Sequence, residues 1–165
     1  MEITKRKALT GARYLSFVLD QEEYCIEILK IKEIMAMAAV TPIPQTPDFL
    51  RGVLNLRGQI IPVIDLRLKF HMPELAYTDR TIIVIVELAL DGEKTLMGLV
   101  VDSIKEVVNI PEDKVTKMPY VNSKVKSEFI EGIAESGDGI KIVLDITKVL
   151  TEDEFVLLKD IPSAR

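Results

Sequence analysis

Apolar residues alternate with polar ones along much of this chain, and the alternation predicts short β-strands. Alternating strands of this kind are expected at three places, residues 15–19, 24–29 and 140–146. The run 82–86 is apolar and β-branched throughout, which is typical of a strand buried on both faces. A turn at Asp91-Gly92 then leads into an expected return strand at 96–101.

Helix signals are few. Thr151 and Glu154 have the spacing of a capping box, which predicts a short C-terminal helix within 151–165. Asp65 stands where it can cap a single helical turn over the next few residues. The pattern as a whole predicts an all-β fold, a small-barrel or sandwich architecture with short helices.

An internal repeat is the most informative feature of the sequence. Phe49-x-x-Gly52 recurs as Phe129-x-x-Gly132, 80 positions later, and the two segments align without a gap through Asp65 and Asp145 to Phe70 and Leu150. Upstream, Ile-Lys-Glu-Ile at 31–34 resembles Ile-Lys-Glu-Val at 104–107, with a different offset.

The repeat predicts two similar β units, one at about residues 13–75 and one at about 80–150. Terminal segments of one unit can cross into the other, because the pattern does not say which strands pair. Residues 1–12 are charged and lack the apolar core of a signal peptide, so they are expected to form a flexible lead.

Composition narrows the function classes. The 165 residues are 48% hydrophobic and 28% charged, and no run of about 20 apolar residues could span a bilayer. The net charge of −5 disfavours nucleic-acid binding, which needs a concentrated basic face. A single cysteine, Cys25, cannot form an internal disulfide, so the cytoplasm is the expected compartment.

Few residues could carry chemistry. Cys25 lies among apolar neighbours and His71 in a loop, and no third group is indicated that would orient them as a catalytic pair. The sequence contains no Cys/His cluster for zinc and no glycine-rich phosphate loop, and we expect neither cofactor nor metal. Asp65 and Asp145 could form a carboxylate pair, but their equivalent places in the repeat favour helix caps.

Positions that differ between the two copies separate function from fold. The turn Asn55-Leu-Arg57-Gly58 has no match in the second copy, so the shared architecture does not demand Asn55 or Arg57. Arg57 is either an exposed turn residue or a contact for a protein partner. Glu33 has a counterpart, Glu106, which favours a structural role, although an ion pair between Glu33 and Arg57 is the other interpretation.

Isoleucines recur at every third position at Ile28, Ile31 and Ile34, and a similar spacing returns at Ile104 and Val107. They belong either to the core or to an apolar seam between the two units that could receive a partner helix.

The longest motif in the chain resembles the signature of CheW coupling proteins. It consists of Thr41-Pro42-Ile43-Pro44 and then Phe49-x-x-Gly52-Val53-Leu54-Asn55-Leu56-Arg57-Gly58-Gln59-Ile60-Ile61-Pro62-Val63-Ile64-Asp65-Leu66-Arg67. Shorter matches follow at Gly98–Asp102 and at Gly132-Ile133, Gly139 and Leu144-Asp145. The resemblance runs from about Tyr14 to Leu150 and leaves both termini uncovered.

The resemblance implies one CheW-like domain made of two SH3-like five-stranded barrels. It implies a cytoplasmic, non-enzymatic adaptor, recruited to membrane-associated receptor arrays, that joins the regulatory domain of the histidine kinase CheA to the tip of methyl-accepting chemotaxis receptors. An adaptor of the same family in non-flagellar motility or another receptor–kinase pathway is the alternative.

The resemblance also implies the site residues. Carried onto this sequence, the receptor groove between the barrels would include Leu15, Ile28, Ile31, Ile34, Ile104 and Val107. The family further pairs an acidic residue at the place of Glu33 with the arginine at Arg57, next to Asn55 and Gly58.

Overall fold

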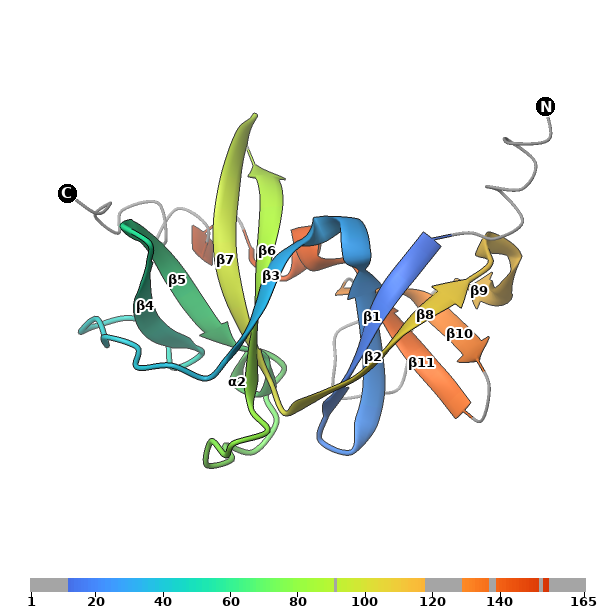
Figure 1. The fold of residues 1–165 in the computed structure, drawn as a ribbon, viewed down its shortest axis with the longest axis horizontal. Helices are drawn as coiled ribbons and strands as arrows, with labels where there is room; N and C mark the ends of the chain where they lie inside the picture. The colour runs from blue at the N-terminus through green and yellow to red at the C-terminus, as the bar shows by residue number, and fades with distance from the viewer. Residues whose placement is uncertain (1–11, 91, 118–128, 137–138, 152, 155–165) are drawn as a thin grey trace.

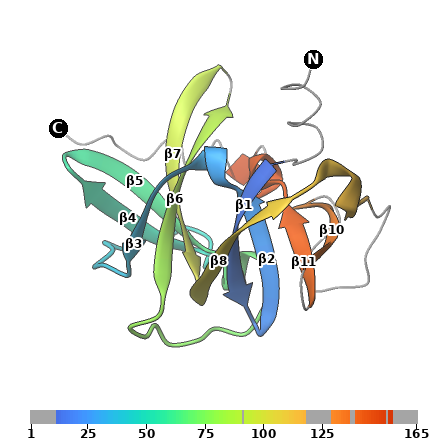
Figure 2. The ribbon, with the colours of Figure 1, turned by 45° about the vertical axis from the view of Figure 1, so that its right-hand side comes forward.

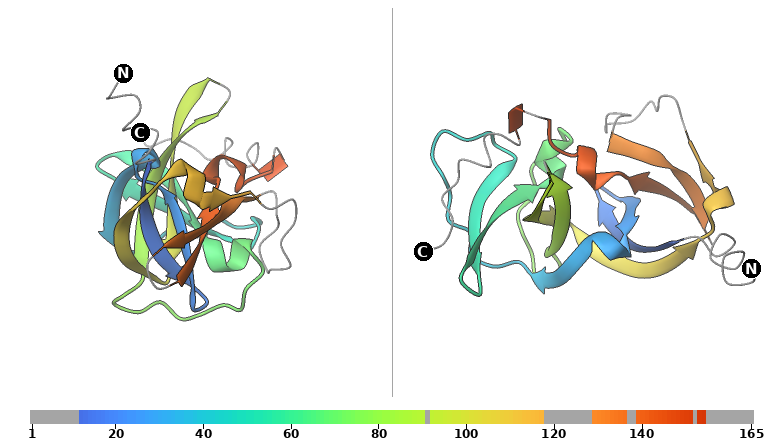
Figure 3. Two further views of the ribbon diagram at one scale, coloured as in Figure 1. Left: turned by 90° about the vertical axis from the view of Figure 1, so that its right-hand side faces the viewer. Right: turned by 90° about the horizontal axis from the view of Figure 1, so that it is seen from above.

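The structure, a computed structural model, describes residues 12–90, 92–117, 129–136, 139–151 and 153–154. Its strands form two lobes that lie side by side along the long axis (Figure 1), as the view from above also shows (Figure 3, right). Within the described residues, no helix is both long enough and apolar enough to cross a membrane.

The first barrel is a five-stranded sheet. Its strands, in spatial order, are β3 (Ile31–Ala36), β6 (Ile82–Leu90), β7 (Glu93–Val101), β5 (Gln59–Asp65) and β4 (Leu50–Leu56). The chain between β3 and β4 forms one further bridge, Thr41 to Val53, beyond the edge of β4.

The second barrel is a six-stranded sheet. Its strands, in spatial order, are β8 (Ser103–Ile110), β1 (Ala12–Leu19), β2 (Glu22–Glu27), β11 (Gly139–Leu144), β10 (Ile130–Ser136) and β9 (Val115–Thr116). The two-residue strand β9 is the sixth, so the expected five-stranded barrels are present with one short addition. Figure 2 gives a clearer view of this barrel.

Each barrel is built from both halves of the chain. The hairpin β1–β2 pairs with β8 and β11, whereas the hairpin β6–β7 pairs with β3 and β5. The two hairpins have thus changed places, relative to a chain in which each half keeps its own strands. The expected units at 13–75 and 80–150 are consecutive stretches of the chain. In the structure, each of these stretches contributes strands to both sheets.

The repeat is visible in the backbone hydrogen bonds. A bulge between Leu50 and Gly52 in β4 has its counterpart between Ile130 and Gly132 in β10. The Asp65 N–H donates to the carbonyl of Phe49 at 2.8 Å, and the Asp145 N–H donates to that of Phe129 at 2.9 Å. The described residues of the segments 49–65 and 129–145 therefore have the same local structure, as the sequence predicts.

Strand register extends the correspondence to the exchanged hairpins. Val63 faces Gly98 and its counterpart Val143 faces Cys25, so β7 corresponds to β2. Ile31 faces Val86 and its counterpart Ile104 faces Phe17, so β6 corresponds to β1. Every strand of the first barrel thus has an equivalent in the second.

The helical turns begin at capping residues. The carboxylate of Asp65 accepts from the N–H groups of Arg67 and Leu68 at the start of α2 (Leu66–Lys69), and Asp145 accepts from the Thr147 N–H at η4 (Ile146–Lys148). Both aspartates are therefore caps, as the repeat predicts. The other 3-10 turns are η1 (Ile28–Lys30) and η2 (Glu112–Lys114).

The predicted capping box at the C-terminal end is confirmed. The Glu154 N–H donates to the Thr151 hydroxyl at 3.1 Å, and the Thr151 N–H donates to the Glu154 carboxylate at 2.9 Å. Lys69 of α2 also bonds Glu154 at 2.8 Å, which ties this end of the chain to the barrels. The rest of the predicted helix and residues 1–11 of the lead predicted at 1–12 lie outside the described residues, whereas Ala12 begins β1.

Most buried side chains belong to a core that lies between the barrels. It takes residues from both sheets, such as Phe17 and Tyr24 from the second barrel and Val84 and Leu99 from the first. Smaller clusters fill the interiors of the first barrel, around Ile61, and of the second barrel, around Cys25. Because the shared core is the largest, the two barrels stabilise each other.

Candidate functional site

The predicted apolar residues lie on equivalent strands. Ile31 and Ile34 belong to β3, and their counterparts Ile104 and Val107 belong to β8. Both strands lie on the side of the molecule that faces the viewer in Figure 1, which is the lower side of the right-hand panel of Figure 3. Ile28 lies in η1, the turn that leads into β3.

Packing divides these residues into two kinds. Ile28, Ile31 and Ile104 are half-buried and pack against the core between the barrels. Leu15, in contrast, belongs to that core and is only 1% exposed. Leu15 pairs with Val107 across the β1–β8 ladder, and its burial leaves it almost no area to offer to a partner.

Ile34 and Val107 are the exposed members of the set. Ile34 is 43% exposed and Val107 45% exposed, at positions that correspond in the repeat. Large aliphatic side chains gain free energy when a partner removes them from water, at roughly 25 cal/mol per Å². Ile34 and Val107 therefore offer exposed aliphatic area on β3 and β8 that a protein partner could cover.

Sequence reasoning missed Leu29. It lies in η1 between two predicted residues and is 87% exposed. The strand expected at 24–29 ends at Glu27 in the structure, so Leu29 lies in a helical turn instead of in a strand. The signal for its exposure would have been Lys30, a charged residue that directly follows. We call Ile28, Leu29, Ile31, Ile34, Ile104 and Val107 the apolar surface.

The predicted turn forms a tight hairpin between β4 and β5. Arg57 (φ 51°) and Gly58 (φ 88°) are its two central residues, between the paired Leu56 and Gln59. Positive φ at both positions is characteristic of a type I′ turn, whose twist suits a hairpin. The side-chain oxygen of Asn55 accepts from the Gly58 N–H at 2.8 Å. Asn55 and Gly58 thus shape the turn that carries Arg57.

Arg57 and Glu33 form the ion pair that the sequence allows. The Arg57 guanidinium contacts both carboxylate oxygens, at 2.5 Å and 3.4 Å, and so links the turn to β3. The hydrogen bond from Arg57 lowers the pKa of Glu33, and the carboxylate in turn raises the pKa of Arg57. Because the arginine side chain is 71% exposed, the pair is available to a partner while adding little to stability.

The second barrel contains a buried polar cluster that sequence reasoning did not identify. Lys141 of β11 is almost fully buried and lies 3.0 Å from the carboxylate of Glu23 on β2. Glu23 also accepts hydrogen bonds from Lys105 at 2.6 Å and from the Ser16 hydroxyl at 2.9 Å. Burial alone would raise the pKa of Glu23, but these three donors outweigh it and lower the pKa to about 2.

The equivalent positions of the first barrel are apolar. The correspondence of strands matches Lys141 with Ile61, Glu23 with Leu96 and Ser16 with Ile85. Those three residues pack in the interior of the first barrel. The fold accepts either kind of interior, so the polar cluster is a property of the second barrel alone.

The candidate catalytic residues are not brought together. Cys25 lies inside the second barrel, where burial raises the pKa of its thiol to about 12. His71 is exposed after α2 at a positive φ of 61°. Across the part of the chain that the structure describes, no group of three or more His, Cys, Asp or Glu residues could hold a metal ion.

Comparison with known proteins matches this architecture. The family model of the CheW-like domain covers residues 13–154. The chemotaxis protein CheW of Klebsiella aerogenes is 35% identical over 151 residues, which cover 92% of this chain and 89% of that protein. CheW of Treponema pallidum is 32% identical over 147 residues, which cover 89% of this chain and 86% of that protein.

A solved structure agrees. The crystal structure of the scaffolding protein TtCheW from Thermoanaerobacter tengcongensis superposes with a TM-score of 0.77 at 33% identity, covering 87% of this chain and 90% of that one. Sequence motif, repeated barrels and relatives that match over nearly their whole length all lead to one assignment: the chain belongs to the CheW family of chemotaxis scaffolding proteins.

Proposed function

We propose that this chain is a non-enzymatic adaptor that couples methyl-accepting chemotaxis receptors to the histidine kinase CheA. The observation that carries the proposal is the apolar surface, with Ile34 and Val107 exposed at equivalent positions of β3 and β8. Its work is binding, without a bond made or broken, and the buried thiol of Cys25 agrees with that role.

The receptor is the partner proposed for the apolar surface. A receptor's cytoplasmic tip is helical, and an amphipathic helix presents apolar side chains at a spacing of three and four residues. The half-buried Ile31 and Ile104 would line the contact, while the exposed Ile34, Val107 and Leu29 would bury most of their area in it. Such apolar anchors dominate the affinity of protein interfaces.

The turn with Arg57 is the second proposed contact. Its guanidinium is exposed, held by Glu33 and carried by a rigid hairpin, so it could form directional hydrogen bonds with a partner at small entropic cost. The regulatory domain of CheA is the proposed partner of the barrels, since that domain resembles this one and two such domains can pack barrel against barrel.

An adaptor with two contacts raises the local concentration of kinase near receptor. A change in the receptor can then shift the kinase between states, provided that the contacts differ between those states. Such a protein works in the cytoplasm and is recruited to membrane-associated receptor arrays.

The test is a pull-down with a CheA regulatory domain and, separately, with a receptor signalling-tip fragment. The unchanged protein should bind both. Ile34→Asp should weaken receptor binding at least about tenfold, because it places a charge in an apolar contact, and should leave kinase binding unchanged.

Ile140→Asp is the matched control, because Ile140 is 61% exposed and lies outside the apolar surface. It should bind both partners normally. Unchanged receptor affinity in folded Ile34→Asp would remove the proposed surface, and failure of the unchanged protein to bind either partner would remove the adaptor role.

A further inference from the structure

We propose that Arg67 is a positioning residue that joins the two barrels. It holds in place β8, the strand that carries Ile104 and Val107 of the apolar surface. The inference rests on the proposed function, since it assigns Arg67 a part in receptor binding without contact to the receptor. It goes beyond the family signature, which contains Arg67 but does not say what its side chain does.

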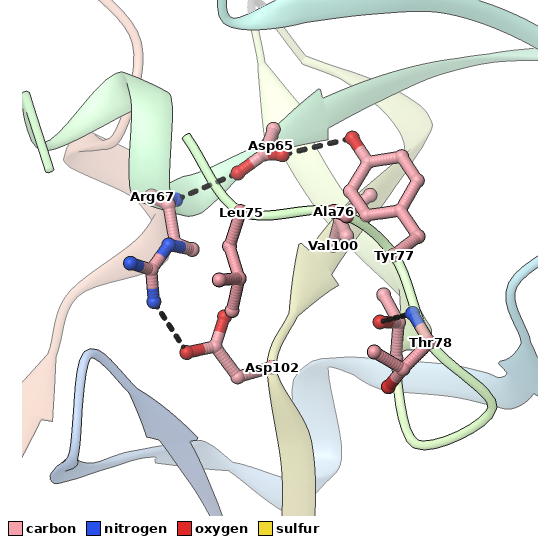
Figure 4. A pocket seen from close by; sticks show the side chains of 9 residues that line it. Asp65, Arg67, Leu75, Ala76, Tyr77, Thr78, Val100 and Asp102 are labelled. Carbon is pink, nitrogen blue, oxygen red and sulfur yellow. Dashed lines mark hydrogen bonds and ion pairs between the residues drawn. The ribbon is translucent and has the colours of Figure 1, made fainter. Parts of the chain in front are cut away.

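The guanidinium of Arg67 is bonded to three separate segments. Its side chain is only 9% exposed. Nη1 donates to the Asp102 carboxylate at 2.6 Å, and Nε donates to the carbonyl of Pro73 at 2.9 Å. Nη2 lies 3.5 Å from the carboxylate of Asp20. Figure 4 shows the side chain extending from α2 toward Asp102.

These contacts cross from one barrel to the other. Arg67 lies on α2, which follows β5 of the first barrel, whereas Asp20 lies in the turn of the β1–β2 hairpin of the second. The Asp102 carboxylate also accepts from the Asp20 N–H at 2.9 Å, and the Asp102 N–H donates to the carbonyl of Val18 at 3.1 Å. The link between β7 and β8 is therefore fixed to both barrels at Asp102.

We call Arg67 with its partners Asp102 and Asp20 the clamp. The clamp lies close in sequence to part of the apolar surface. Asp102 directly precedes β8, and Ile104 follows two residues later. Ile104 and Val107 are held against Phe17 and Leu15 of β1 by the β1–β8 ladder. A shift of Asp102 and the β1–β2 turn would therefore move Ile104 and Val107 together, relative to Ile31 and Ile34 on the first barrel.

The repeat shows that the fold does not require this clamp. By strand register and capping position, Arg67 corresponds to Thr147, Asp20 to Ala89 and Asp102 to Leu29. None of these three counterparts carries a charge, so one of the two equivalent junctions has a guanidinium clamp and the other does not. A bond that is absent from the equivalent junction serves something other than the strand pairing that both barrels share.

The test measures barrel placement and binding separately, in the full chain. Spin labels at Ala36→Cys on β3 and Lys114→Cys in η2 report the distance between the barrels, and both positions are exposed. Cys25 can stay, because its buried thiol, with a pKa near 12, does not react with the label. Receptor affinity is measured on the same proteins with a signalling-tip fragment.

Two variants weaken the clamp while keeping its bulk. Arg67→Lys keeps the charge but loses the planar fork, and Asp102→Asn keeps the shape but loses the charge. Each should shift or broaden the distance distribution by about 2 Å and raise the Kd for the receptor fragment roughly five- to tenfold, with a folded circular dichroism spectrum. Arg51→Lys, which alters the Arg51–Glu74 pair at 3.2 Å, is the matched control and should change neither quantity.

The outcomes separate the two proposals. An unchanged distance distribution in both clamp variants overturns the positioning role, and so does a changed distribution with an unchanged Kd. If the unchanged protein does not bind the receptor fragment at all, the proposed function fails and with it the role of Arg67 in binding, whatever the distances show.

Discussion

The protein has two kinds of ion pair, which differ in what they contribute. One is the exposed pair of Arg57 and Glu33, and the other is the buried pair of Lys141 and Glu23. The exposed pair is screened by water and contributes little to folding, so its proposed value lies in presenting a guanidinium at a fixed place. The buried pair is shielded from water, so loss of either partner would leave an uncompensated charge inside the second barrel.

Replacing Arg57 tests the exposed pair. Arg57→Ala should keep the melting temperature within about 2 °C of the unchanged protein, because an exposed pair contributes little to stability. It should nevertheless lower receptor-stimulated CheA autophosphorylation, measured with receptor, kinase and adaptor together. Arg51→Ala removes another Arg–Glu pair and serves as the control. Full kinase activation by Arg57→Ala would contradict a role for the turn.

The Glu23 cluster predicts how stability depends on pH. The pKa of Glu23 falls from 4.5 to about 2 on folding, so its contribution is present above pH 4.5 and is lost as the pH falls toward 2. After solvent screening we expect a loss of about 1–2 kcal/mol in unfolding free energy over that window. Urea unfolding at several pH values should show this loss in the unchanged protein and a smaller one in Glu23→Gln. Equal pH profiles would argue against the low pKa.

At the scale of elements, the bulge in β4 depends on one glycine. Gly52 has a φ of 139°, and a Cβ atom there would overlap the carbonyl oxygen of Thr41. That carbonyl accepts from the Val53 N–H at 2.9 Å and so forms the bridge beside β4. Gly132 occupies the equivalent bulge, where a Cβ would come within 2.8 Å of the Thr116 carbonyl oxygen. The glycine of the Phe-x-x-Gly motif is therefore required because a second backbone segment approaches closely at this position.

Gly52→Ala should accordingly destabilise the protein by about 3 kcal/mol, through backbone strain and overlap with the neighbouring chain. Gly139→Ala is the control, because Gly139 opens onto free space and has no positive φ. Chemical denaturation of both variants measures the difference. Similar midpoints for the two variants would mean that the Thr41 segment moves aside freely.

The elements themselves could largely be predicted from the sequence. The apolar run at 82–86 lies in β6, the alternating run at 15–19 lies in β1, and the caps at Asp65 and Asp145 begin helical turns. Periodicity and capping are local signals, so they find elements where those signals are strong. The turn η1 was missed, because a strand pattern continues into it without a glycine or proline.

Pairing and burial could not be predicted in the same way. Alternation shows which residues share a face, but two hairpins with the same pattern fit the same partners. The exchange of β1–β2 and β6–β7 therefore had to come from the structure. For the same reason Leu15 could be assigned to an apolar face without showing that it is buried in the core beside β8, and nothing in the pattern marked Lys141 as buried.

At the scale of the whole molecule, the buried polar cluster distinguishes the two hairpins. If each hairpin stayed with its own half of the chain, Glu23 would face Ile61, and Lys141 would face Leu96. Each of these two contacts would bury a charge beside an apolar residue, at a cost of several kcal/mol. The pairing of Glu23 with Lys141 thus favours the exchanged arrangement over its alternative.

A double-mutant cycle tests this matching. Glu23→Leu alone should destabilise by about 3 kcal/mol, because it leaves the buried Lys141 without its close carboxylate. Adding Lys141→Ile recreates the apolar interior of the first barrel and should recover most of that loss. Unfolding curves of the four proteins give the coupling energy. Purely additive losses would show that the pair is not matched.

The hairpin exchange also determines how the molecule responds as a unit. A break in the chain between α2 and β6 would leave each fragment with part of both sheets and with neither barrel closed. The two barrels are thus interlocked, because each contains strands from both halves of the chain, and unfolding one barrel removes support from the other. A ligand that holds either lobe closed therefore protects both from unfolding. In an adaptor between two partners, cooperativity of this kind would couple the binding of one partner at one barrel to the stability of the other barrel, without a change of conformation.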